Sequence, residues 1–155
     1  MSCTTIAIES TYRMKILAID YGVKRMGYAI SDETESIAFP HSVSEVFDEA
    51  SSIKATQDVI KETEAKKIIV GIPINMDGTS GEMVQKVMLF VNKLKEITGI
   101  DVETYDERMS TQIAEKTLLQ GDMSRSKRRK VRDKLSAQIV LQNYLDLKAI
   151  NNETN

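Results

Sequence analysis

Carboxylates occur at three separate places where the sequence predicts that a strand ends or a helix begins. These places are Asp20, the pair Asp106 and Glu107, and Asp133. If the chain folds so that they meet, their oxygens are the ligands that Mg²⁺ prefers. Two such ions roughly 4 Å apart could activate a water molecule and stabilise the leaving oxygen of a phosphodiester. The spacing therefore raises the hypothesis of metal-assisted phosphodiester hydrolysis.

Each of these carboxylates also has an ordinary structural interpretation. An Asp after a strand is commonly a turn residue or a helix cap. Asp133 continues the helical stripe of Ala137, Val140, Leu141 and Tyr144, and a carboxylate on an apolar face is costly unless a cation partners it. That partner is a neighbouring arginine, the helix N-terminus or a metal ion, and the spacing leaves these alternatives open.

The composition fits one ordinary globular domain. The chain has 155 residues, 28% of them charged and 41% hydrophobic, with a formal net charge of -2. One cysteine, Cys3, and one histidine, His41, exclude a disulfide framework and a Cys-rich or His-based metal cluster. We expect an N-terminal extension over residues 1–13, one domain over 14–148 and a C-terminal tail over 149–155.

The hydropathy pattern gives no reason to expect a membrane protein. No run approaches the roughly 20 apolar residues that a membrane span needs. Residues 1–13 do not have the pattern of a signal peptide, because their apolar run is three residues long and a Glu follows it. We therefore expect a cytoplasmic protein that does not bind membranes.

The order of the predicted elements indicates an α/β fold. Three short strands come first, and Pro40 assigns the third of them to a sheet edge. Gly22, in the first turn, is expected to allow a positive φ or a close backbone approach. The predicted strands cover residues 15–20, 25–31, 37–43, 67–71 and 101–105, and the predicted helices cover 48–65, 79–98, 111–120 and 130–147.

This order predicts a mixed five-stranded sheet with helices on both faces. Antiparallel hairpins come first and strand–helix–strand crossovers follow. Strands 15–20, 67–71 and 101–105 would be the parallel set. Ligands collect beyond the carboxyl ends of parallel strands, so Asp20 and the pair Asp106–Glu107 are expected at one edge.

The second predicted helix has recognisable ends. Thr79 and Glu82 have capping-box spacing, with Thr79 as the N-cap, and Gly99 stands where a helix-ending glycine is expected. Methionines at core spacing, Met83 and Met88, are expected to pack inside. The predicted apolar stripe consists of Met83, Val87, Phe90, Val91, Leu94 and Ile97.

Residues 124–134 form a basic segment in an otherwise acidic chain. The basic segment holds seven Lys or Arg and a single Asp, while the whole chain is net negative. Such a cluster can bind a polyanion, most simply a nucleic-acid backbone, although a solvated charge run is the commoner explanation. Residues 121–129 are expected to be mobile ahead of the last helix.

Four motifs together resemble the RuvX family, also called YqgF. The first is DYGVKRMGYAISD at residues 20–32, and the second is GIPINMDG at 71–78. The third is DERMST at 106–111, and the fourth covers 130–145 with one departure at Arg132, where an aliphatic residue is expected. The resemblance spans residues 15–147. It implies a ribonuclease H-like fold and a nuclease acting at the 5′ end of pre-16S rRNA, with Holliday-junction resolution as the alternative.

The resemblance also implies roles for individual residues. The catalytic acids would be Asp20, Glu107 and Asp133, with Asp106 competing with Glu107 as a metal ligand. Asp20 would bridge two Mg²⁺ ions, and Mn²⁺ is the alternative metal. The expected partner is structured RNA such as pre-rRNA, or branched DNA, bound by a monomer or a homodimer. Candidate nucleic-acid contacts are Lys24, Arg25, Asn75, Arg108, Arg125, Lys127, Arg128, Arg129 and Lys130.

Two functions from other classes are alternatives to a nuclease. A nucleic-acid-binding ribosome-assembly or transcription factor could keep the fold without efficient catalysis, but a pure binder has no need of converging acids. Sugar kinases and actin-like ATPases also begin with Asp-x-Gly after a first strand, as in Asp20 to Gly22. Their architecture needs two such lobes, and 155 residues supply one.

Overall fold

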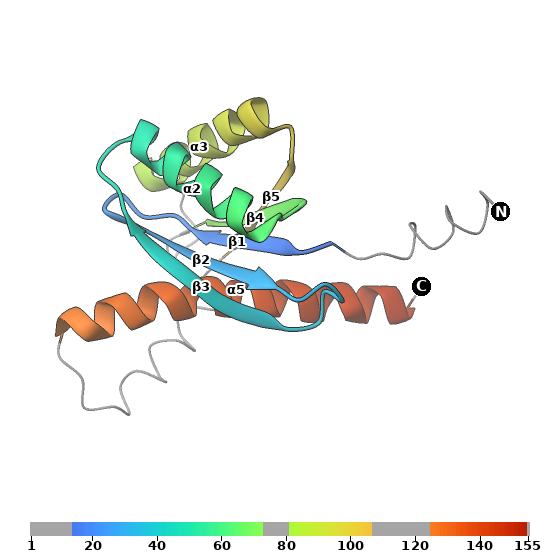
Figure 1. Ribbon diagram of the computed structural model, residues 1–155. Coiled ribbons are helices and arrows are strands. Elements are labelled where there is room, and N and C mark those ends of the chain that lie inside the picture. Colours follow the sequence, from blue (N-terminus) through green and yellow to red (C-terminus); the bar gives the residue numbers. More distant parts are fainter. Residues whose placement is uncertain (1–13, 73–80, 107–124, 155) are drawn as a thin grey trace.

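A computed structural model describes residues 14–72, 81–106 and 125–154, with the backbone alone for 125–134 and 152–154. A five-stranded sheet forms the middle layer, and helices cover both of its faces (Figure 1). The fold is therefore α/β with a mixed sheet, as the order of elements predicted. Within these described ranges, no helix is both long and apolar enough to cross a membrane.

The sheet has the strand order β3-β2-β1-β4-β5. β1 pairs antiparallel with β2, which pairs antiparallel with β3, whereas β1, β4 and β5 are parallel. Pro40 lies on the edge strand β3, opposite a register shift, where a residue without an N–H is tolerated. The strands are β1 (Ile16–Asp20), β2 (Arg25–Ser31), β3 (Ala38–Glu45), β4 (Lys67–Ile72) and β5 (Asp101–Asp106).

Helices α2 (Glu49–Thr63) and α3 (Glu82–Thr98) lie on one face of the sheet, and α5 (Arg125–Thr154) lies on the other (Figure 1). The central strands are apolar except at their ends because both of their faces are covered. In β1, Leu17 and Ile19 pack on the α2–α3 side, whereas Ile16 and Ala18 pack on the α5 side. Because successive side chains of a strand point to opposite faces, these four residues determine the face to which each remaining residue of β1 belongs.

The α2–α3 core also buries the side chain of Tyr28 of β2, which carries a hydroxyl. Its hydroxyl lies 3.0 Å from Oγ1 of Thr56 on α2. Because Thr56 gives its own proton to the carbonyl of Ser52, 2.9 Å away, Tyr28 is the donor. Burial raises the pKa of Tyr28 to about 12, so the hydroxyl keeps its proton and the buried group is satisfied.

The helix ends follow capping chemistry, with one correction. Asp48 caps α2, accepting from the backbone N–H of Ser51 at 2.7 Å. Gly99 ends α3 at a φ of 68°, as predicted. The prediction of Thr79 as N-cap of the next helix was wrong, because α3 begins at Glu82 with Gly81 as its N-cap. Glu82 is thus the first helical residue and not the third.

Two residues of the predicted apolar stripe are not in the core. Val87, Phe90 and Leu94 are buried, as expected, and Met83 packs partly against them. Met88 and Ile97 are 39% and 46% exposed, so their assignment to the core was wrong. The reason is that α3 lies at the border of its layer, so a narrower stripe is covered.

α5 is longer than the sequence pattern predicted. It begins at Arg125, so the first residues of the basic segment are helical, where we had expected a mobile stretch up to residue 129. It continues to Thr154, into the range that we had assigned to a tail. Arg, Lys, Gln and Leu favour helix, and residues 125–154 contain neither Gly nor Pro. The predicted helix over 111–120 lies outside the described residues.

Polar contacts fasten the second half of α5 to the edge at which the parallel strands begin. The Tyr144 hydroxyl donates to Oε2 of Glu103 at 3.1 Å, and Lys67 Nζ lies 3.1 Å from the other carboxylate oxygen. On the other edge strand of the sheet, Gln142 Oε1 accepts from the backbone N–H of Ala38, the first residue of β3, at 2.9 Å. These contacts fix the direction in which α5 crosses the sheet.

The turn between β1 and β2 depends on Gly22. A Cβ added at Gly22 would lie 2.2 Å from the backbone carbonyl oxygen of Arg25. The glycine is thus required by a close backbone approach and not by a positive φ, which resolves the two alternatives expected from the sequence. The turn is also tied to the start of α2, because the Val46 N–H donates to the Lys24 carbonyl at 2.9 Å.

Replacing Glu103 by Gln is expected to weaken the docking of α5 in a pH-dependent way. Burial pushes the pKa of Glu103 up, but the hydrogen bonds from Lys67 and Tyr144 outweigh it, so the pKa lies below its ordinary value of 4.5. The carboxylate therefore stabilises the fold above about pH 4.5, and this stabilisation is lost as the pH falls through the lowered pKa.

Because Glu103 is 45% exposed, solvent screening limits the expected loss for Glu103→Gln to about 0.5 kcal/mol in unfolding free energy at pH 7. Urea denaturation at pH 7 and pH 3.5 measures it, with exposed Glu96→Gln on α3 as the control. A Glu103→Gln deficit that is equal at both pH values would contradict the assignment.

Replacing Gly22 by Ser is expected to distort the turn that follows Asp20. The new Cβ meets a backbone atom, which cannot rotate away, so overpacking should cost about 1–3 kcal/mol. Gly81→Ser is the matched control, because no atom of the described residues lies within 4 Å of a Cβ there and Ser is a good N-cap. Thermal unfolding should give a lower melting temperature for Gly22→Ser than for Gly81→Ser, and equal melting temperatures would contradict the close approach at Gly22.

Candidate active site

Asp20 lies at the end of β1, between two glycines on the neighbouring strands. It is in register with Gly27 of β2 on one side and with Gly71 of β4 on the other. Asp20 itself is half-buried. Neither neighbouring position therefore has a side chain that could cover the carboxylate, as occurs where a ligand or another backbone approaches a sheet closely.

The carboxylate of Asp20 belongs to the face of the sheet that α5 covers. Residues of the same phase in β1, Ile16 and Ala18, pack in the α5-side core. Continuing across the sheet from Gly71, the next residue in register is Tyr105 of β5, which also packs on this side. Two strand spacings, about 10 Å, thus separate the Asp20 and Tyr105 positions.

Asp106 reaches the same edge of the sheet but belongs to the opposite face. It shares its phase with Val102, which is buried in the α2–α3 core. The pleat of β5 therefore favours Glu107 over Asp106 as the partner of Asp20, and the choice between the two as metal ligand stays a prediction. Asp106 acts on its neighbour Tyr105, whose pKa is raised first by burial and then by this negative charge. Glu107 lies outside the described residues.

Asp133 lies in the first half of α5, on the side of the sheet to which Asp20 belongs. It is one helical turn before Ala137, which is buried against the sheet. The first turns of α5 extend past the edge at which β1 ends (Figure 1). The helix backbone that carries Asp133 and the basic segment is thus near the Asp20 end of the sheet, while the side chain of Asp133 lies outside the description.

The candidate nucleic-acid contacts divide into described and undescribed residues. Lys24 is exposed in the turn after Asp20, and Arg25 begins β2 opposite Glu45, so both are at the Asp20 edge. Asn75 and Arg108 lie outside the described residues. Only the helical backbone is described for Arg125, Lys127, Arg128, Arg129 and Lys130.

The described side chains alone do not form a metal centre. Among them, no three His, Cys, Asp or Glu residues group together closely enough to hold an ion. Of the three acids that would share the metals, only Asp20 has a described side chain. Its donor chemistry fits a hard divalent cation, because it offers carboxylate oxygens from the end of a central strand with no side chain at either neighbouring position.

The sequence contains a local signal for this arrangement that the predicted site did not include. Gly27 and Gly71 each interrupt an apolar strand run, and glycine inside a strand often marks a close approach. What the sequence could not supply was the register that puts both glycines beside the same aspartate. These two residues are therefore added to the candidate site.

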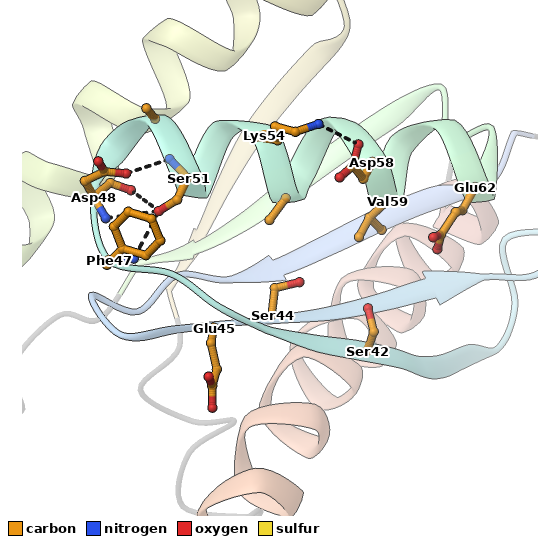
Figure 2. A pocket seen from close by; sticks show the side chains of 12 residues that line it. Ser42, Ser44, Glu45, Phe47, Asp48, Ser51, Lys54, Asp58, Val59 and Glu62 are labelled. Carbon is orange, nitrogen blue, oxygen red and sulfur yellow. Dashed lines mark hydrogen bonds and ion pairs between the residues drawn. The ribbon is translucent and has the colours of Figure 1, made fainter.

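A hollow of about 780 Å³ between β3 and α2 is not part of this site (Figure 2). It lies on the α2 side of the sheet, whereas Asp20 belongs to the α5 side. Several of the polar side chains that line it have structural partners, since Asp48 caps the helix at Ser51 and Lys54 pairs with Asp58 at 3.7 Å. We assign no chemistry to it.

Solved structures of Holliday-junction resolvases share this fold. The chain is similar to RuvC of Thermus thermophilus, with a TM-score of 0.56, 14% identity and coverage of 88% of this chain and 96% of that one. It is also similar to the yeast mitochondrial resolvase Ydc2, with a TM-score of 0.53, 11% identity and coverage of 90% and 80%. At such identities the likeness establishes the fold alone, which is ribonuclease H-like.

Much closer relatives are found by sequence. A protein of Caldanaerobacter subterraneus subsp. tengcongensis is 42% identical over 134 residues, which are 86% of this chain and 96% of the relative. One of Clostridioides difficile is 43% identical over 134 residues, with coverage of 86% and 95%. Both carry the name "Putative pre-16S rRNA nuclease". The family model described as "RuvX: Holliday junction resolvase" matches residues 14–147. This chain therefore belongs to the RuvX family.

Proposed function

We propose that this chain is a metal-dependent endonuclease that hydrolyses phosphodiester bonds at the 5′ end of pre-16S rRNA. The names of its relatives, at about 40% identity over most of the chain, support the reaction and the substrate. The observation that carries the proposal is the position of Asp20. It ends a central parallel strand, between two glycines, on the face covered by the helix that carries the basic segment.

The proposed ligand set is Asp20, Glu107 and Asp133. Asp106 is left out because it belongs to the opposite face of β5. Bound Mg²⁺, or Mn²⁺ as the alternative, would polarise the attacking water and neutralise charge on the phosphate. Asp20 contributes a carboxylate whose backbone is fixed by strands on both sides, so it needs little reorganisation to bind.

The basic segment would supply affinity that does not depend on base sequence. Lys and Arg side chains that neutralise phosphates release condensed counterions, which favours binding at low salt. Lys24 and Arg25, in the turn and strand after Asp20, would add contacts near the reacting phosphate. In this arrangement the positive charges bind the sugar–phosphate backbone of the nucleic acid, and the acids act on one of its phosphates.

Holliday-junction resolution is the second candidate function. The description of the matching family model favours it. A four-way junction presents two symmetric strands, so that reaction calls for a dimer with two sites, whereas one precursor rRNA end does not. A binder without catalysis is the third possibility, and it predicts no dependence of product formation on a divalent metal.

Asp20→Asn is expected to abolish cleavage without lowering thermal stability. Removing a residue that only hydrogen-bonds to a metal ligand lowers metal affinity or activity about 10–100-fold. Removing the ligand itself should therefore lower the cleavage rate more than about a hundredfold. The assay offers a pre-16S rRNA 5′ fragment and a four-way DNA junction in parallel, each with Mg²⁺ or with EDTA. Asp58→Asn, an exposed Asp on α2, is the matched control.

The outcomes of this assay separate the candidate functions. Metal-dependent cleavage of the rRNA fragment that Asp20→Asn removes supports the proposal, and cleavage of the junction instead supports the second candidate. Binding without cleavage of either substrate leaves the third. Full activity of Asp20→Asn would exclude Asp20 from the site.

Neutralising the basic segment is expected to flatten the salt dependence of binding. Each lost phosphate contact should reduce the slope of log K against log salt by about 0.7–0.9. The variant replaces Arg125, Lys127, Arg128, Arg129 and Lys130 by Gln. A control with the same change in charge replaces the exposed lysines of the opposite layer and its connections, Lys54, Lys61, Lys66, Lys93 and Lys95.

Fluorescence anisotropy with a labelled RNA at several KCl concentrations gives both slopes. An equal reduction in the two variants would mean that net charge alone acts and that the basic segment is not a binding surface.

A further inference from the structure

A second, smaller hollow lies directly beside the Asp20 end of β1, on the α2–α3 side. Its volume is about 270 Å³, and Tyr21, the residue after Asp20, forms part of its wall. Because successive residues of a strand point to opposite faces, the end of β1 presents a carboxylate on one side and a phenol ring on the other. We call this space the Phe47 hollow; it is lined by Tyr21, Val23, Phe47, Asp48, Glu49, Ser52, Lys86 and Leu89.

Three of the apolar residues that line the Phe47 hollow are unusually exposed. Phe47 is 84% exposed, Leu89 63% and Val23 46%. They come from three different parts of the fold, namely the connection between β3 and α2, the middle of α3 and the turn after β1. Contiguous exposed apolar side chains that line a hollow mark a binding surface more often than a random patch does.

The backbone of Phe47 is held in place although its ring is exposed. Its N–H donates to Oγ of Ser51 at 3.0 Å, within the capping contacts of α2 that Figure 2 shows. The preceding residue, Val46, donates to the carbonyl of Lys24 at 2.9 Å, which ties this segment to the turn after Asp20. The ring is thus presented from a fixed position, so a partner that stacks on it pays little ordering cost.

The chemistry of the lining favours a flat, uncharged ligand with an amino edge. The Tyr21 ring packs against Phe90 with centroids 5.1 Å apart, so an aromatic wall is already fixed. Asp48 and Glu49 disfavour a phosphate inside the hollow. Oδ1 of Asp48 caps α2 and Oε1 of Glu49 pairs with Lys93, but each carboxylate keeps a second oxygen that can accept a hydrogen bond from an exocyclic amino group of a base. Lys86, also in the lining, can meet the phosphate of an adjacent nucleotide. A nucleobase has this combination of features.

We propose that the Phe47 hollow binds an unpaired nucleobase of the nucleic-acid strand whose phosphate lies at Asp20. This inference rests on the proposed nuclease function and specifies its substrate. A base inside a duplex has both faces stacked and cannot enter, so the chain prefers substrates with unpaired nucleotides beside the cleaved bond. Stacking on an aromatic ring tolerates any base, so it adds preference for strand state and little for sequence.

The test uses Asp20→Asn protein, so that binding is measured without cleavage. One probe is a fully paired RNA duplex, and the other is the same duplex with two unpaired nucleotides, one of them 2-aminopurine. Adding Phe47→Ala should weaken binding of the second probe about five- to a hundredfold and leave the duplex unchanged. Phe47→Trp should retain the affinity, and 2-aminopurine fluorescence should be quenched only when the ring is present.

Phe39→Ala is the matched control. Phe39 is 49% exposed near the opposite end of β3, about 20 Å along the strand from Glu45. If Phe39→Ala weakens binding as much as Phe47→Ala does, or if Phe47→Ala has no effect on the unpaired probe, the proposal is overturned.

Cleavage by the chain with native Asp20 keeps the two proposals distinguishable. If metal-dependent cleavage occurs at the same rate with or without Phe47→Ala, and with or without unpaired nucleotides, the base-binding role of the Phe47 hollow is wrong and the nuclease function stands. If the unpaired probe binds in a way that depends on Phe47 but no cleavage occurs, the nuclease function is wrong and the hollow is a base-binding site on a non-catalytic protein. Failure to bind either probe removes both.

Discussion

The alternation of side chains along β1 is the constraint on which the candidate site depends. Leu17 and Ile19 are fixed in the α2–α3 core, and this fixes Asp20 on the α5 side. A register slip of one residue would turn Leu17 and Ile19 toward α5 and would turn Asp20 toward the α2–α3 core. The face on which the acid lies is therefore set by the apolar packing of the strand that precedes it. The same rule separates Asp106 from Asp20, although both lie at one edge.

α5 combines a structural half with a charged half. Its second half is attached to the sheet through Tyr144, Gln142 and the buried Leu141. Its first turn has no acidic residue, and its basic residues stand at the helix end where the macrodipole is positive. Positive charges at that end are locally unfavourable, and such conflicts are expected at functional sites, where a bound partner relieves them. A polyanion beside the first turns would do so, which is why the conflict favours nucleic acid over a merely solvated run.

The fold could be predicted from the sequence further than the site could. Apolar runs bounded by turn residues gave the five strands, and the bounds of β2 agree with the prediction at both ends. Local spacing did not determine the start of α3, because Thr79 and Gly81 compete as caps. It also did not give the exposure of Met88 and Ile97, which depends on how much of α3 the sheet covers. The pairing of the two glycines with Asp20 requires strand register, which a single sequence does not encode in any local pattern, and the face of Asp106 requires knowing which layer covers Val102.

The step from Asp20 to Tyr21 links the two surfaces at this edge. One residue of extended chain carries the carboxylate to the α5 side and the ring to the α2–α3 side, so the two are neighbours that face opposite layers. A nucleic-acid strand that meets both must bend around the edge of the sheet, with phosphate on the basic, α5 side and a base turned out toward Phe47. A continuous duplex resists such a bend, whereas an unpaired junction or loop allows it. The preference for unpaired nucleotides thus follows from the same alternation that positions the acid.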